Sequence, residues 1–274
     1  MAKFHNAKCG ASWVVLAALV ASCATVQTTQ QGAIGVDRKQ YMIVSEEAVE
    51  KSAATAYEQV LDGANKKGEL NVDAAQTARI KAIGHRLIQF TAVFRPDAVN
   101  WSWQINVQVT PDVNAYCMPG GKIMVYSGLI EKLNATDAEL AVVVGHEIAH
   151  ALREHTRERV SRIYVQQVGL GVLAALTGAG DAAVQLAGQI STVTFTLPHS
   201  REQEAEADRI GLELMARAGY DPQAAVSLWQ KMDKLSDNKT PAFLSTHPAS
   251  ADREQELKRA IPKVNALFEA APKP

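Results

Sequence analysis

One short pattern constrains this chain more than any other: the H-E-x-x-H sequence from His146 to His150. Residues four apart on a helix share a face, so both imidazoles can reach one metal ion if this segment is helical. The surrounding run AELAVVVGHEIAHAL is apolar almost all round, and Thr136 with Glu139 forms a capping box at its start. The pattern therefore predicts a buried central helix that carries two metal ligands.

The donor types in this pattern favour zinc. Zinc prefers nitrogen and oxygen donors in tetrahedral geometry, and a catalytic zinc site keeps one position open for water. Glu147 follows the first histidine and is placed to take a proton from that water as general base. Two histidines do not complete such a site, so a third ligand is needed. Metzincins have Gly and His shortly after the pattern, but Arg153 and Thr156 stand there, which excludes that class.

A glutamate on a later helix can supply the missing ligand. The segment SREQEAEAD, from Ser200 to Asp208, contains Glu204 four residues before the aspartate, so both carboxylates lie on one helix face. Glu204 would bind the zinc, and Asp208 would accept a hydrogen bond from the far nitrogen of a ligand histidine and fix its tautomer. Glu202 and Glu206 are expected to be solvated and to stabilise the helix dipole.

Composition and charge define the class of protein. A chain of 274 residues that is 47% hydrophobic and 21% charged can bury the core of one globular domain with extensions. Its 28 basic and 29 acidic residues leave a formal net charge of -1, so the chain lacks the basic field that nucleic acid binding requires. We therefore expect no nucleic acid partner.

The N-terminal residues have the three parts of a secretory signal. Lys3 and Lys8 precede an apolar run over 13–20, and small residues then precede Cys23. This arrangement resembles the lipobox of bacterial lipoproteins, in which Cys23 is lipidated and begins the mature chain. A plain cleaved signal and an uncleaved anchor remain alternatives, although the run is far shorter than the ~20 residues of a membrane span. Ala24 after the cysteine points, by resemblance, to the outer membrane.

Removal of the signal leaves one free thiol, because Cys9 departs with it and Cys23 becomes a thioether. Cys117 is then expected to be a small buried hydrophobe, and no intramolecular disulfide can form. A polar segment over 23–40 is typical of a flexible tether, followed by a folded domain over 41–262 and a tail over 263–274. The expected elements are helices over 45–67 and 73–93, a strand over 101–110, a hairpin over 114–126, and helices over 136–152, 157–176, 182–194, 200–218, 221–235 and 252–260.

Four motifs together resemble one known family. They are NAYCMPGGKIMVYSGLI (114–130), ELAVVVGHEIAH (139–150), the Glu204 and Asp208 pair, and the segment from Thr246 to Pro248 followed by Arg253. With them the chain resembles the gluzincin peptidases of the CAAX prenyl protease, HtpX and Oma family, especially its periplasmic lipoprotein members. The resemblance implies an α+β fold: a mostly helical, zincin-like metallopeptidase domain with a small β-sheet whose edge strand lies beside the active site. It also implies one Zn²⁺ per chain.

The resemblance assigns roles to further residues. Asn114, Ala115 and Tyr116 would form the edge strand that pairs with the backbone of an extended substrate, although an ordinary hairpin is an equal alternative. His247 would face the metal, where it either steadies the oxyanion or closes the open position of the zinc, and Arg253 would lie near it. A loop histidine and a surface arginine are the alternatives. The other histidines, His85, His155 and His199, are expected to be solvated or structural.

The activity implied is that of a zinc-dependent endopeptidase in the periplasm. Its expected partners are unfolded or misfolded envelope proteins, the membrane through a lipid on Cys23, and the envelope assembly machinery. One alternative is a chaperone or assembly factor for outer-membrane proteins that holds extended chains in the same groove, with latent activity. A structural zinc site is another alternative, but it would prefer four ligands, often cysteines. We expect neither the long membrane spans nor the helical repeats of some members of the family.

Overall fold

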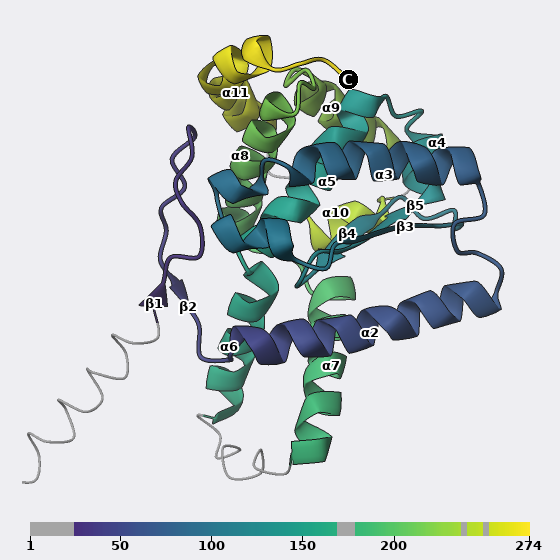
Figure 1. Cartoon of the computed structure of the whole chain (residues 1–274), viewed down its shortest axis with the longest axis vertical. Coiled ribbons are helices and arrows are strands. Elements are labelled where there is room, and N and C mark those ends of the chain that lie inside the picture. Colours follow the sequence, from purple (N-terminus) through teal and green to yellow (C-terminus); the bar gives the residue numbers. More distant parts are fainter. Residues whose placement is uncertain (1–24, 169–178, 237–239, 249–251) are drawn as a thin grey trace, which may run out of the picture.

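Helix α5 (Asp137–Leu152) runs through the middle of the fold in the computed structural model, which describes residues 25–168, 179–236, 240–248 and 252–274 (Figure 1). The capping box between Thr136 and Glu139 begins this helix, and every residue from Glu139 to Leu152 is buried. Helices α3 (Ala74–Ile88) and α8 (Arg201–Arg217) pack against α5. The sequence prediction of a central buried helix is confirmed.

A small mixed sheet lies beside α5. Its strands are β3 (Gln104–Gln108), β4 (Ala115–Met118) and β5 (Lys122–Tyr126), in the order β3-β5-β4. β3 is parallel to β5 and β4 is antiparallel to it, so β4 is an edge strand within the described part of the chain. Gly120 and Gly121 both have positive φ at the hairpin corner, a conformation that favours glycine. The predicted hairpin is confirmed.

Both faces of the sheet are covered. Along β4, Ala115 and Cys117 point into the core shared with α3 and α5, whereas Tyr116 and Met118 point into a second core with α2 and α7. Cys117 is buried with a free thiol, as expected. The remaining elements are α2 (Glu46–Lys66), η1 (Thr91–Val93), η2 (Pro96–Asn100), α4 (Ser127–Lys132), α6 (His155–Val168), α7 (Ala179–Phe195), α9 (Ala224–Ser236), α10 (Ala242–Thr246) and α11 (Arg253–Ala270).

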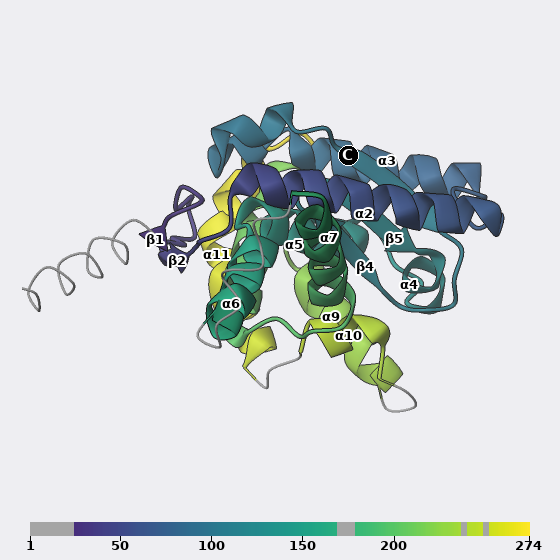
Figure 2. The same ribbon diagram turned by 90° about the horizontal axis from the view of Figure 1, so that it is seen from below.

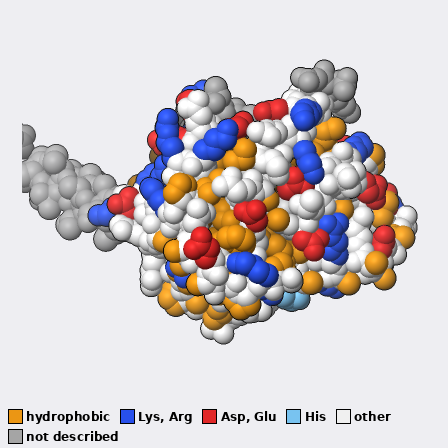
Figure 3. Space-filling model, turned by 90° about the horizontal axis from the view of Figure 1, so that it is seen from above, with side chains coloured by type: hydrophobic (Ala, Val, Ile, Leu, Met, Phe, Trp, Pro, Cys, Tyr) orange, Lys and Arg blue, Asp and Glu red, His pale blue; other side chains and the backbone are white. Residues whose placement is uncertain are grey.

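Helices α6 and α7 lie side by side, and α2 crosses α7 (Figures 1 and 2). The part of the predicted helix pair that falls on residues 169–178 lies outside the described residues. Among the helices that the structure describes, none is long and apolar enough to cross a membrane. On the face shown in Figure 3, basic and acidic side chains are interspersed, in agreement with the nearly balanced charge.

The crossing of α5 and α8 depends on two glycines, Gly145 and Gly211. A Cβ built on Gly211 of α8 would lie 2.8 Å from the backbone nitrogen of His146 and 2.9 Å from the carbonyl carbon of Gly145 in α5. Contacts this short are not compatible with a side chain, so α5 and α8 touch backbone to backbone. This approach brings the acidic face of α8 to the histidine face of α5.

The segment over 23–40 is not the flexible tether that its composition predicted, because residues 25–40 pack against the domain. Strands β1 (Thr25–Val26) and β2 (Gln40–Tyr41) pair with each other, and the backbone N–H groups of Ala33 and Ile34 both donate to the Glu213 carboxylate. Ile34 and Val36 lie within the main core. A polar composition concealed this packing because most of the contacts are hydrogen bonds and ion pairs to residues far along the chain.

Arg38 fastens this N-terminal segment most firmly. Its guanidinium donates to both oxygens of Glu158 in α6, at 2.6 and 2.9 Å, and to both oxygens of Glu206 in α8, at 2.7 and 3.1 Å. Both carboxylates are buried, so each needs a cation. Burial would raise the pKa of Glu158, but the hydrogen bonds from Arg38 outweigh it and lower the pKa to about 2.

The expected tail over 263–274 is also corrected in part. α11 continues through Pro262 to Ala270, and Leu257, Ile261 and Val264 are buried at helical spacing along it. Their burial against the core outweighs the hydrogen bond that the proline removes.

The first prediction concerns the helix crossing. Gly211→Ala forces α5 and α8 apart, so we expect the free energy of unfolding, measured in urea, to fall by about 1–3 kcal/mol. Gly63→Ala in α2 is the matched control, because a Cβ there meets nothing within 4 Å. The control gains about 0.5–1 kcal/mol from its better helix propensity. Equal effects of the two substitutions would contradict the proposed backbone contact.

The second prediction concerns acid stability. Because the pKa of Glu158 is lower in the folded protein than in the unfolded chain, its contribution is complete above the unfolded value of 4.5 and is lost as pH falls toward about 2. Arg38→Gln raises this pKa, so we expect the acid-unfolding midpoint, followed by circular dichroism, to move to higher pH. Arg162→Gln, which removes a half-exposed partner of the same carboxylate, should move it much less.

Candidate metal centre and active site

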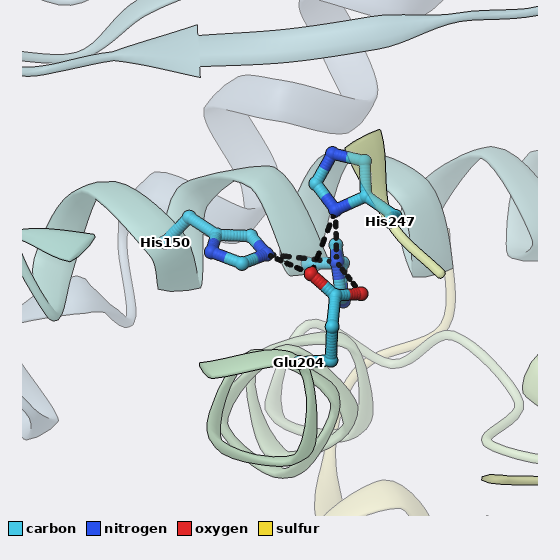
Figure 4. A group of neighbouring side chains, drawn as sticks. His150, Glu204 and His247 are labelled. Carbon is cyan, nitrogen blue, oxygen red and sulfur yellow. Dashed lines mark hydrogen bonds and ion pairs between the residues drawn. The ribbon is translucent and has the colours of Figure 1, made fainter. Parts of the chain in front are cut away.

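Helices α5 and α8 bring the predicted metal ligands together. His146 and His150 lie one turn apart on α5 and face Glu204 on α8, and all three side chains are buried. Figure 4 shows the carboxylate of Glu204 directed toward His150 and His247. The Nε2 atoms of the two histidines are 3.0 Å apart. Glu204 places Oε1 3.3 Å from the His150 Nε2 and Oε2 3.5 Å from the His146 Nε2.

These spacings fit a tetrahedral ion. Zinc bonds of about 2.0–2.1 Å place neighbouring tetrahedral donors about 3.3 Å apart, which is close to the separations among the nitrogens and oxygens of this cluster. Oε2 of Glu204 is within 2.8 Å of Arg253 Nη1, yet neither atom has a hydrogen bond of acceptable geometry among the described residues. The Glu204 carboxylate and the imidazole nitrogens that it faces together form a suitable donor set for zinc.

His247 joins the same cluster. It follows the last residue of α10, and its Nδ1 lies 3.0 Å from Glu204 Oε1 and 3.2 Å from His146 Nε2. The ring stacks on Phe243 on one side, at 4.3 Å between centroids, and on His199 at 5.0 Å. Four donors from His146, His150, Glu204 and His247 thus lie within 4.8 Å of one another. His247 occupies the position that the fourth ligand of a tetrahedral ion would take.

Glu147 lies on the other side of His247. Its carboxylate is buried, and Oε1 is 3.4 Å from the His247 Nε2 without a hydrogen-bond partner among the described residues. Burial raises the pKa of Glu147, and the nearby His247 and His146 oppose this effect only in part. A carboxylate with a raised pKa, beside the cluster, is suited to take up a proton.

Asp208 and Arg253 hold His146 in place on the side of its ring away from Glu204. Asp208 Oδ1 is 3.0 Å from His146 Nδ1, so it can accept a hydrogen bond from the Nδ1–H group, and this leaves Nε2 free for the metal. Arg253 donates to both oxygens of Asp208, at 2.6 and 2.7 Å, and stacks over the Trp229 ring at 3.7 Å. Burial would raise the pKa of Asp208, but Arg253 outweighs it and the net shift is downward. The structure therefore places Arg253 inside the site and not at the surface.

The predicted substrate strand lies at the edge of the sheet next to Glu147. Asn114 precedes β4 and its carbonyl accepts from Tyr126 N at 3.0 Å, while Ala115 and Tyr116 begin the strand. The backbone amide of Cys117 in β4 is near enough to Glu147 to lower its pKa slightly. β4 is the last strand on this side of the described sheet, and its pairing with an extended substrate stays a prediction.

Three residues that sequence reasoning set aside lie at the site. His155 is fully buried and its Nδ1 is 2.7 Å from the Nδ1 of His150. The His199 and His150 rings are tilted by 39° with centroids 4.0 Å apart, and Glu206 is buried against Arg153. The solvated position expected for Glu206 is therefore wrong, and of the two alternatives given for His155 and His199 the structure supports the structural one. His85 and Glu202 are exposed.

The local sequence gave only a weak signal for the position of His155. α5 ends at Leu152, and Glu154 has a positive φ of 50°, so the chain turns back and directs His155 toward the helix it has just left. A histidine five residues beyond H-E-x-x-H is off the helical period, and only this turn brings the two rings together.

Comparison with known proteins agrees with this geometry. The chain is 38% identical over 167 residues to the mitochondrial metalloendopeptidase OMA1 of Arabidopsis thaliana, covering 61% of this chain and 33% of that protein. It is 26% identical over 245 residues to the metalloprotease YcaL of Escherichia coli, covering 88% and 95%, and 33% identical over 159 residues to the metalloprotease LoiP of Escherichia coli, covering 56% and 60%. The chain thus spans about a third of the length of the Arabidopsis relative. A family model described as Peptidase family M48 matches residues 74–261, which is most of the chain, so the protein belongs to this peptidase family.

Proposed function

We propose that this protein is a zinc-dependent metalloendopeptidase. One observation carries the proposal: the buried carboxylate of Glu147, whose Oε1 has no hydrogen-bond partner among the described residues, lies beside the four-donor cluster. A structural zinc site needs no such group, because its four ligands already satisfy the metal. A binding site for extended chains would not need it either, whereas hydrolysis requires a base at this position.

Each residue of the site has a role in peptide hydrolysis. When bound, zinc would polarise the scissile carbonyl and lower the pKa of the attacking water. Glu147 takes the proton of that water and later delivers it to the leaving amine. His146, His150 and Glu204 hold the ion, and Asp208 fixes the tautomer of His146.

Unfolded or misfolded proteins of the bacterial envelope are the substrates we propose. The edge strand β4 would pair with backbone groups, so it would select extended chains by shape more than by sequence. The signal features before Cys23 support a periplasmic lipoprotein, and Ala24 after the cysteine supports its placement at the outer membrane. Envelope assembly machinery is the partner that this location brings within reach.

The third prediction tests the base. Glu147→Gln keeps the size of the side chain and removes its basicity, so we expect cleavage of an unfolded reporter such as casein to fall by at least about 100-fold. Bound zinc, measured by atomic absorption, should stay at one per chain, because Glu147 is not among the ligands.

Two further results would refute the assignment. A variant that keeps its zinc and cleaves casein as fast as the parent would show that Glu147 is not the base. A parent that cleaves a folded, stable protein as readily as casein would remove the preference for extended chains.

A latent form, with chaperone-like holding of substrates, is the second candidate, and the position of His247 favours it. Its Nδ1 fills the corner of the tetrahedron that water needs, while Phe243 and His199 hold the ring. The same histidine could instead steady the oxyanion after moving away from the cluster.

The fourth prediction separates these two roles. If His247 closes the site, His247→Ala should raise kcat/KM on casein several-fold and weaken zinc binding, since one donor is lost. If it steadies the oxyanion, the same substitution should lower kcat by about 100-fold with little change in zinc affinity. His85→Ala, at an exposed helix position, is the control and should change neither quantity.

A further inference from the structure

His155 connects a metal ligand to a buried carboxylate. Its Nδ1 lies 2.7 Å from His150 Nδ1, and its Nε2 lies 3.0 Å from Glu206 Oε2. The side chain has no exposed surface, so no water competes for these two contacts. Each contact is a short hydrogen bond between buried groups, and the position of one proton in each of them decides what His150 can do.

The charge on Glu206 fixes the proton in the hydrogen bond between Glu206 and His155. Arg153 Nε donates to Glu206 Oε2 at 3.0 Å, and Arg38 donates to both of its oxygens. These cations keep the carboxylate ionised, and an ionised carboxylate only accepts hydrogen bonds. The proton between His155 and Glu206 therefore resides on His155 Nε2. The His155 ring has no exposed surface, and Arg153 and Arg38 already neutralise Glu206, so the ring is neutral and its Nδ1 carries no proton.

The direction of the hydrogen bond between His150 and His155 follows from this protonation. An unprotonated Nδ1 of His155 must accept from His150 Nδ1, so His150 carries its proton on that atom and leaves Nε2 with a free lone pair. Nε2 is the atom that faces His146 and Glu204, at 3.0 and 3.3 Å. We propose that His155, anchored by Glu206, is a positioning residue that sets the tautomer and ring orientation of the metal ligand His150.

The two ligand histidines are thus supported differently. His146 donates directly to the Asp208 carboxylate, whereas His150 donates to a neutral imidazole that relays the hydrogen bond to Glu206. This second arrangement extends to the N-terminal segment, because Arg38 is one of the two arginines that hold Glu206. The inference rests on the proposed metal site but not on peptide hydrolysis.

A second group of three histidines could be mistaken for another metal site. His150, His155 and His199 also place ligand atoms within 4.8 Å of one another. A cation there would have to displace the proton from His150 Nδ1, and the guanidinium of Arg159 lies 3.2 Å from the His199 ring. Both features oppose a second cation, so we expect one zinc per chain.

Two substitutions of similar size separate the two nitrogens of His155. Asn places its side-chain oxygen near the position of Nδ1, so His155→Asn keeps an acceptor for His150 and loses the contact with Glu206. Gln reaches toward the position of Nε2, so His155→Gln keeps the contact with Glu206 and loses the acceptor. His155→Leu removes both. A residue that only fills space would show no preference between Asn and Gln.

The fifth prediction is the zinc affinity of these variants, measured in the full protein by competition with a chelator. We expect His155→Gln and His155→Leu to bind zinc about 10–100-fold more weakly, and His155→Asn to stay within about threefold of the parent. The visible absorption of the cobalt-substituted protein should change in the first two variants and not in the third, because the spectrum reports the ligand set.

Glu158→Gln is the matched control, since it breaks the pairing with Arg38 without touching His155. It should lose stability in urea yet keep its zinc affinity. Equal affinities in all three His155 variants, or losses that follow only their unfolding free energies, would overturn the proposal. Two zinc ions bound per chain would overturn it as well. A parent that binds zinc but fails to cleave casein would count against the proposed function alone.

Discussion

The metal centre depends on one contact: the backbone of α5 against the backbone of α8 at Gly145 and Gly211. Ordinary helix pairs lie 8–10 Å apart, and long side chains then separate the two axes. Here no side chain stands between the helices, so the short reach of Glu204 is enough to bring its carboxylate to the imidazoles on α5. The same approach sets Asp208 against His146 one turn further along α8. Gly145 and Gly211, which have no side chains, thus determine the distance between the ligand residues on α5 and those on α8.

Buried charges surround this contact, and most are matched. Asp208 is held by Arg253, Glu206 by Arg153 and Arg38, and Glu213 by Arg217. Pairing of this kind adds little net stability, but an unpaired charge would be costly. Among these buried acids in the described structure, Glu147 differs because its pKa is raised and one oxygen is unpartnered. Its contrast with the neutralised carboxylates around it is a physical reason to assign it the chemical role.

The sequence predicted what spacing along one helix or hairpin can encode. Two histidines four apart, two acids four apart, the capping box of Thr136 and Glu139, and the hairpin over 114–126 are local patterns, and each appears where it was expected. His155 and Arg38 were missed because their partners are set by tertiary packing: a turn with positive φ in one case, and two helices more than a hundred residues away in the other. Composition misled most over residues 25–40, where polar side chains form buried bonds with the domain.

The packing of this N-terminal segment affects where the enzyme can work. A flexible leash of about 17 residues would have a root-mean-square reach of about 20–25 Å, and the catalytic domain could sample a wide volume around its anchor. With the proposed lipid on Cys23, β1 begins only two residues later, and two residues span at most about 7 Å. A protein anchored in this way would carry its active site close to the bilayer. Its working space would be a thin layer parallel to the membrane, and a substrate would have to enter that layer to be cut.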